Sequence, residues 1–123
     1  MDRAPRVLLV SDDQEWLAER RSAFADGGYN TAIERWNAVP AKVDFEEMPD
    51  IVLIDFANLT APIANGICHL IRAQGDESRI IAMVARSADA TQIEAGAVDA
   101  VCSLRMADSL LEIAKGQLAE TPG

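Results

Sequence analysis

Three short, unbroken runs of apolar residues, most of them branched, constrain the fold of this chain more than any other feature. They are Val7–Val10, Ile51–Ile54 and Ile80–Val84. A run that is apolar at every position, rather than at every second one, indicates a strand buried on both faces, as in parallel sheets. Two weaker segments, Tyr29–Ile33 and Ala100–Cys102, are predicted as further short strands.

Segments with helical features separate these strands. Apolar and charged residues mix over Gln14–Ala25, which two glycines follow, and Met106–Leu118 has apolar residues at core spacing. Shorter helices are predicted at Ile67–Ala73 and Ala90–Ala95, whereas Pro40 interrupts the segment between the second and third strands. Strands that alternate with helices predict right-handed crossovers and an α/β fold, with a doubly wound five-stranded parallel sheet covered on both faces.

Composition limits the size and the partners of the domain. The 123 residues are 50% apolar, which suits one domain; we expect it to span residues 1–119, with 120–123 as a tail or the start of a linker. Twenty acidic residues against eleven basic ones give a net charge of -9, which disfavours direct contact with nucleic acid or an anionic membrane. No apolar run approaches the roughly 20 residues of a membrane span, and a cytoplasmic location is expected.

Polar side chains follow the predicted strands at their carboxyl ends, where the functional crevice of an open parallel sheet lies. Asp12, Asp13 and Asp55 would converge there without a lysine or histidine among them. Oxygen ligands of this kind suit Mg²⁺, and a carboxylate beside Mg²⁺ can attack phosphorus to form an aspartyl phosphate. The alternative is that Asp12 or Asp13 only caps the first helix. The same rule places Ser11, Val84 and Ser103 at this edge.

The two cysteines and the single histidine do not form a recognisable metal or catalytic pattern. Cys68 and Cys102 lie far apart with no CxxC spacing, so a zinc site would lack ligands. Cys68 and His69 are adjacent, and neighbours on a helix do not face each other. We therefore expect both thiols to be reduced residues of the core.

Four segments of the chain resemble receiver domains of two-component signalling, the modules that response regulators use. Val7–Asp13 is similar to the family's first strand with its acidic pair, and Pro49–Asp55 to the strand that ends on the phosphoacceptor aspartate. Ile80–Arg86 and Glu94–Ala100 are similar to the fourth strand and to the segment before the fifth. The resemblance covers nearly the whole chain and implies the strand order 2-1-3-4-5.

The resemblance also implies a phosphorylation site at the edge of the sheet. Asp55 would accept a phosphoryl group from a histidine kinase, as in a phosphorelay. Mg²⁺ would be held by Asp12, Asp55 and the carbonyl of Ala57, with Asp13 beside them.

Three positions depart from the family pattern, so any Mg²⁺ affinity is expected to be weak. Ser11 stands in place of the first acidic residue, although sliding the match by one residue would make Asp12 and Asp13 the pair. We prefer the unslid match, because sliding turns the strand's side chains to opposite faces. Val84 replaces the Ser/Thr switch, and Ser103 replaces the lysine that pairs with the phosphoryl group.

The connection after the phosphoacceptor position also departs from the family. The stretch from Phe56 to Gly66 is expected to be longer than usual. It would be either a cover over the site or a neutral insertion, which loops tolerate at modest entropic cost.

These departures favour a pseudo-receiver, a signalling module that acts through protein–protein interaction without relying on phosphorylation, and not an enzyme. Expected partners are a histidine kinase, an effector domain, another signalling protein or a second copy of the chain. The face expected to bind them includes Ala97, Val101 and Arg105. The alternative is a functional phosphoacceptor, phosphorylated on Asp55 with Mg²⁺. A small-ligand sensor has no motif in its favour.

Overall fold

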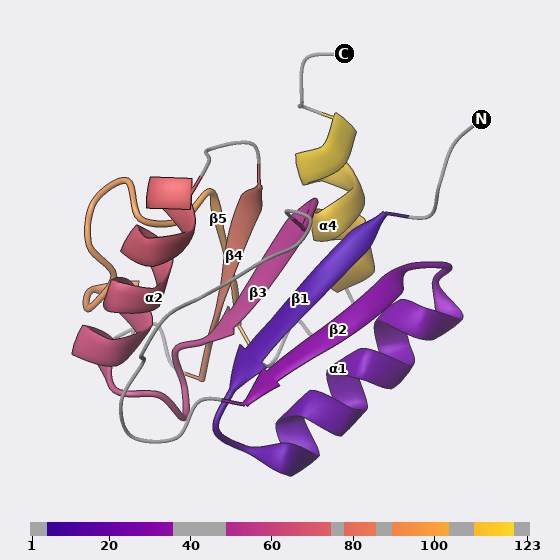
Figure 1. Ribbon diagram of the computed structural model, residues 1–123, viewed down its shortest axis with the longest axis horizontal. Helices are drawn as coiled ribbons and strands as arrows, with labels where there is room; N and C mark the ends of the chain where they lie inside the picture. The colour runs from indigo at the N-terminus through magenta and orange to yellow at the C-terminus, as the bar shows by residue number, and fades with distance from the viewer. Residues whose placement is uncertain (1–4, 36–48, 75–77, 86–89, 104–109, 120–123) are drawn as a thin grey trace.

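Five parallel strands form a single sheet with helices on both faces (Figure 1). The computed structural model describes residues 5–35, 49–74, 78–85, 90–103 and 110–119. The strand order is β2-β1-β3-β4-β5, and every neighbouring pair is parallel. Both the fold class and the strand order predicted from the sequence are therefore confirmed. The strands are β1 (Arg6–Ser11), β2 (Asn30–Arg35), β3 (Ile51–Asp55), β4 (Arg79–Val84) and β5 (Ala100–Ser103).

The sheet separates two apolar layers, and helices cover both. Helix α2 spans Ala61–Gln74 and packs on one layer; α1 (Gln14–Asp26) and α4 (Leu110–Ala119) pack on the other. Along β1, Leu8 and Val10 belong to the α2 layer, and the residues on either side of Leu8 belong to the opposite one. All five residues of β3 are buried. Burial on both faces explains why the predicted strands are apolar at every position.

Helix α2 begins six residues earlier than the predicted start at Ile67. Its first turn is closed by the Ala64 amide, which donates to the Thr60 carbonyl at 2.9 Å. Pro62 lies in this first turn, where the missing N–H removes no intrahelical hydrogen bond. The expected long connection is thus wrong in its extent, because only residues 56–60 separate β3 from α2.

The segment before β5 differs from the predicted helix Ala90–Ala95. Only Ala90 is helical among these residues, and turns follow it up to Gly96, whose φ is +78°. Asn65 of α2 holds the segment by two hydrogen bonds: its Nδ2 donates to the Gln92 carbonyl at 2.8 Å, and its Oδ1 accepts from the Glu94 amide at 3.0 Å. A buried side chain of α2 therefore satisfies two backbone groups of this segment, in addition to the local bond from the Ile93 amide to the Ala90 carbonyl at 3.2 Å.

The remaining boundaries agree with the sequence to within a few residues. Helix α1 ends one residue after the predicted end, and β2 begins one residue after Tyr29. The expected tail at 120–123, the interrupted segment around Pro40 and the predicted helix start at Met106 lie outside the described residues. Within the described helices, none is long and apolar enough to cross a membrane.

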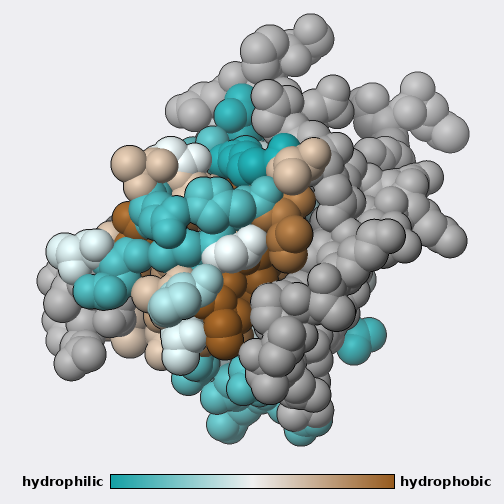
Figure 2. Space-filling view, turned by 60° about the vertical axis from the view of Figure 1, so that its left-hand side comes forward, coloured by the Kyte–Doolittle hydropathy of each residue, from teal (hydrophilic) through white to brown (hydrophobic). Residues whose placement is uncertain are grey.

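The surface is polar over much of the side that α2 covers. Figure 2 turns this side forward and shows mostly hydrophilic residues with a narrow hydrophobic strip beside them. Among the described residues, Val101 of β5 is the only exposed large hydrophobic one, at 45%.

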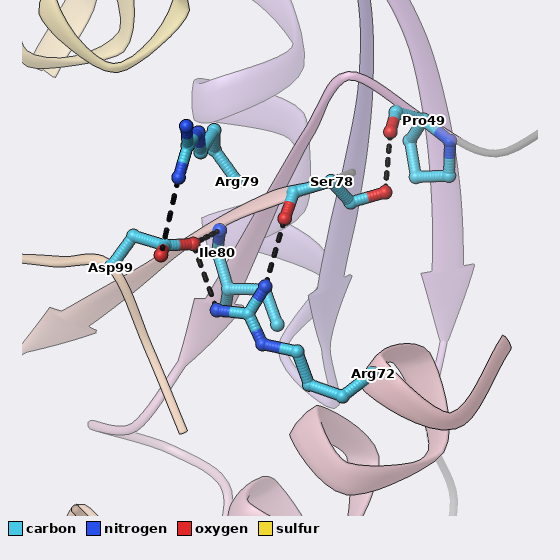
Figure 3. Close-up of polar contacts among 6 residues, drawn as sticks. All are labelled: Pro49, Arg72, Ser78, Arg79, Ile80 and Asp99. Carbon is cyan, nitrogen blue, oxygen red and sulfur yellow. Dashed lines mark hydrogen bonds and ion pairs between the residues drawn. The ribbon is translucent and has the colours of Figure 1, made fainter. Parts of the chain in front are cut away.

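A polar network joins the amino ends of the strands, opposite the edge with the candidate site (Figure 3). Asp99 Oδ2 accepts from the Ile80 amide and from Arg72 Nη2, both at 2.8 Å, and Arg79 lies within ion-pair distance of Oδ1. Arg72 Nη1 also donates to the Ser78 carbonyl at 3.0 Å. One carboxylate thus ties α2, β4 and the segment before β5 together.

Replacing Asp99 with alanine is expected to lower the free energy of unfolding by about 1–3 kcal/mol, because the Ile80 amide and the Arg72 guanidinium lose their acceptor. Urea denaturation followed by circular dichroism measures the change. Asp26→Ala, at the exposed end of α1, is the control and should alter stability by less than about 0.5 kcal/mol. Equal losses in the two variants would contradict a role for the network.

Candidate functional site

The carboxyl ends of the strands meet at one edge of the sheet, and the predicted site residues lie there. β1 ends at Ser11, β3 at Asp55, β4 at Val84 and β5 at Ser103. Val10 pairs in register with Ile54, so that Ser11 and Asp55 are level on adjacent strands. Val84 pairs with Ser103 in the same way.

Asp55 is a buried carboxylate whose two oxygens are both occupied. Its Oδ1 accepts from the backbone amides of Ala57 at 2.9 Å and Asn58 at 3.1 Å. Its Oδ2 accepts from the Ser11 hydroxyl at 2.7 Å and from Asn58 Nδ2 at 2.6 Å. Because an ionised carboxylate has about four acceptor positions, these four donors fill them. Asp55 itself has no exposed surface.

Ser11 links Asp55 to the start of α1. Its Oγ accepts from the Asp13 amide at 3.0 Å while its hydroxyl hydrogen is donated to Asp55. The Asp13 carboxylate turns away and accepts from the Trp16 amide at 3.0 Å, which caps α1. Asp13 thus takes the capping role that the sequence left open, and the Asp12 side chain is exposed to solvent.

This donor set does not fit Mg²⁺ as it stands. A bound Mg²⁺ needs oxygen lone pairs at about 2.0–2.1 Å, whereas four donors of the chain already point at the two oxygens of Asp55. Throughout the described part of the chain, no three histidine, cysteine or acidic side chains gather closely enough to hold a metal ion.

Val84 and Ser103 end the neighbouring strands β4 and β5. Val84 is 2% exposed and packs in the apolar layer under α2, where it has no hydroxyl to offer. Ser103 is partly exposed at the end of β5. Ion pairs among the described residues include those of Arg20 with Glu19, His69 with Glu94, and Arg72 and Arg79 with Asp99, and none of these involves Asp55.

The predicted partner face is only partly at the surface. Ala97 is 2% exposed and packs in the core, so its assignment to the surface is corrected: the turns before β5 direct it inward. Val101 is exposed, and Arg105 lies outside the described residues.

Asn58 is the site residue that sequence reasoning missed. It follows Asp55 by three residues, and an aspartate that accepts hydrogen bonds from the amides two and three positions later is a local turn pattern. The turn pattern could therefore have predicted the hydrogen bonds from the Ala57 and Asn58 amides to Asp55. The contact of the Asn58 side chain had no signal in the sequence.

Both cysteines are free and buried, as expected. Burial raises the pKa of Cys68 from 9.0 to about 12, and Arg72 opposes part of this shift. Burial also raises the pKa of Cys102, against a smaller opposing effect of Arg20. Both groups are therefore protonated at neutral pH and suited to packing rather than to nucleophilic chemistry.

No protein-family model matches the sequence, and no curated protein sequence matches it either. Solved structures do match. A response regulator from Thermotoga maritima is 17% identical with a TM-score of 0.75, covering 96% of this chain and 100% of its own. TrrA from the same organism, solved in complex with Mg²⁺-BeF, is 19% identical with a TM-score of 0.73, covering 93% of this chain and 99% of its own.

A CheY-like response regulator receiver domain protein from Methanospirillum hungatei gives the same result. It is 16% identical, with a TM-score of 0.73 and coverage of 97% for both chains. This chain therefore has the fold of response-regulator receiver domains. At such low identity the likeness concerns the fold, and the chemistry of the site must be argued from its own residues.

Replacing Asp55 with alanine is expected to lower the free energy of unfolding by at least about 2 kcal/mol, because several donors lose a buried acceptor. Thermal and urea denaturation measure the loss. The control is Asp12→Ala, which removes an exposed carboxylate from the same edge and should have little effect. An Asp55→Ala variant as stable as the wild type would show that the hydrogen bonds to Asp55 contribute nothing.

The native protein is expected to resist thiol reagents at pH 8, because a thiol with a pKa near 12 forms almost no thiolate there. The unfolded thiol ionises near 9.0, so this group's contribution to stability falls as the pH rises from 9.0 toward 12. Colorimetric thiol titration with and without denaturant tests the first point. Rapid labelling of Cys68 in folded protein would contradict it.

Proposed function

We propose that this chain is a pseudo-receiver, a signalling domain that acts through protein contact and not through phosphorylation of Asp55. The observation that carries the proposal is the state of the Asp55 carboxylate. It is fully buried, and four donors from the chain itself occupy its oxygens. An attack on phosphorus needs a free oxygen lone pair, and here that lone pair is already used.

The charges at the carboxyl ends of the strands also argue against phosphorylation of Asp55. A phosphoryl group brings close to two negative charges, and no ion pair of the described residues supplies a cation to Asp55. Ser103 has no ammonium group to pair with the phosphoryl oxygens, and Val84 has no hydroxyl to transmit its presence. Phosphorylation would therefore lack both its stabilising charge and its readout.

The domain would act on other proteins, and it needs no enzymatic activity of its own to do so. A histidine kinase, an effector domain, another signalling protein or a second copy of the chain would suit the fold. Val101 on the edge strand β5 offers an apolar contact point on the surface. Isolated exposed apolar residues are common, so Val101 would be one element of a larger face.

The second candidate function is a phosphoacceptor that uses Asp55 with Mg²⁺. It is favoured by the position of Asp55 at the end of β3 and by the likeness to TrrA, which was solved with Mg²⁺-BeF. Phosphoryl transfer depends mainly on positioning and metal charge. Rearrangement of the donors around Asp55 would have to come first.

Incubation with acetyl phosphate and Mg²⁺, or with Mg²⁺ and beryllofluoride, separates the two functions. We expect intact-mass spectrometry to detect no aspartyl phosphate and amide chemical shifts to stay unchanged at Ala57 and Val84. The Asp55→Ala variant controls for adducts at other residues. A stable adduct in the wild type that disappears in this variant would overturn the pseudo-receiver proposal.

A further inference from the structure

We infer that the Asn58 side chain blocks access to Asp55 from solvent, and we call it the plug of the site. Its amide nitrogen occupies the position on Oδ2 that a solute would need. The buried Ser11 hydroxyl occupies the other position on the same oxygen. This inference rests on the proposed function and names the residues that impose it. In this closed state both Asp55 oxygens are occupied by donors of the chain. The state then depends on the side chains of Asn58 and Ser11, and not on the fold itself.

The four donors to Asp55 come from three residues, and the burial of these residues places Asn58 on the solvent side. Ser11 has no exposed surface and Ala57 is partly buried, whereas Asn58 is exposed. Asp55 itself is 0% exposed. A solute that approaches Asp55 from solvent therefore meets Asn58, whose Nδ2 lies 2.6 Å from Oδ2.

Two buried residues on either side of positions 57 and 58 anchor the loop, so the part that can move is the Asn58 side chain and not the loop. Phe56 and Leu59 are both buried in the layer under α2. The Phe56 amide donates to the Met83 carbonyl at 2.8 Å, and the Leu59 amide donates to the Asp55 carbonyl at 3.2 Å. Rotation of the Asn58 side chain into solvent would open Oδ2 without breaking either contact.

Ser11 acts differently, because it cannot turn away. Its Oγ already accepts the Asp13 amide, and this contact directs the hydroxyl hydrogen toward Asp55. Because Ser11 has no exposed surface, its hydroxyl hydrogen cannot turn to bulk solvent instead. Of the two donors to Oδ2, Asn58 is therefore the movable one and Ser11 the fixed one. An aspartate in place of Ser11 would supply lone pairs where the chain now supplies a hydrogen.

Mg²⁺ titration of two variants tests the inference. Asn58→Ala removes the movable donor, and Ser11→Asp exchanges the fixed one for a ligand. We expect Asn58→Ala to bind Mg²⁺ about tenfold more tightly than the wild type, and the double variant to bind more tightly still, seen as saturable shifts of the amides at positions 57 and 58. The matched controls, Asn30→Ala and Ser22→Asp on exposed positions, should behave as the wild type.

A second measurement keeps the test independent of how Ser11→Asp folds. In the wild type, the side-chain amide hydrogens of Asn58 should exchange with solvent more slowly than those of the exposed Asn30, because one of them is held by Asp55. Equal exchange rates would overturn the plug. An unchanged Mg²⁺ affinity in folded Asn58→Ala would overturn it as well.

The two proposals fail in different ways. The pseudo-receiver proposal fails if the wild type forms an aspartyl phosphate, whatever the variants do. The plug fails if opening the site leaves Mg²⁺ affinity unchanged, even when the wild type takes up no phosphoryl group.

Discussion

Burial of β3 on both faces is the constraint on which the rest of this structure depends. All five of its residues are buried, with β1 and β4 paired to its two edges. Such a strand can carry polar groups only at its ends. The carboxylate of Asp55 at the carboxyl end of β3, and that of Asp50 just before its amino end, follow this rule. The apolar interior of the sheet stabilises the fold, and the polar groups lie at the two ends of the strands.

The same burial explains the shape of the candidate site. A carboxylate without exposed surface must be paired with a cation or fully hydrogen-bonded, because an unsatisfied buried charge is very costly. Here the second solution is built from the chain: two loop amides, a serine hydroxyl and a side-chain amide. Ser11 contributes to this solution because its hydroxyl donates to Asp55, whereas a carboxylate at the same position would repel it. The site is therefore stable in its closed form.

This protein shares its fold with receiver domains, but a shared fold does not imply a shared functional site. The receiver structures from Thermotoga and Methanospirillum cover almost the whole chain, while identity stays below 20%. The parallel sheet needs only apolar runs and crossovers, which many sequences provide. A site needs particular groups at particular strand ends: here Val84 has no hydroxyl, and Ser103 has a hydroxyl but no ammonium group. The fold alone therefore does not fix the chemistry of this edge.

The sequence by itself determined the parallel sheet, its strand order and the strand ends on which Ser11, Asp55, Val84 and Ser103 lie, because these follow from apolar runs and family-like segments. Only the tertiary structure decided that α2 starts at Ala61, that Ala97 packs inward and that Asp13 caps α1. It also decided the closed state of Asp55. The hydrogen bond from Ser11 spans 44 residues, and the Asn58 side chain is directed by the anchored loop around it. Local pattern carries no information on such contacts, because they exist only once distant strands have been packed side by side.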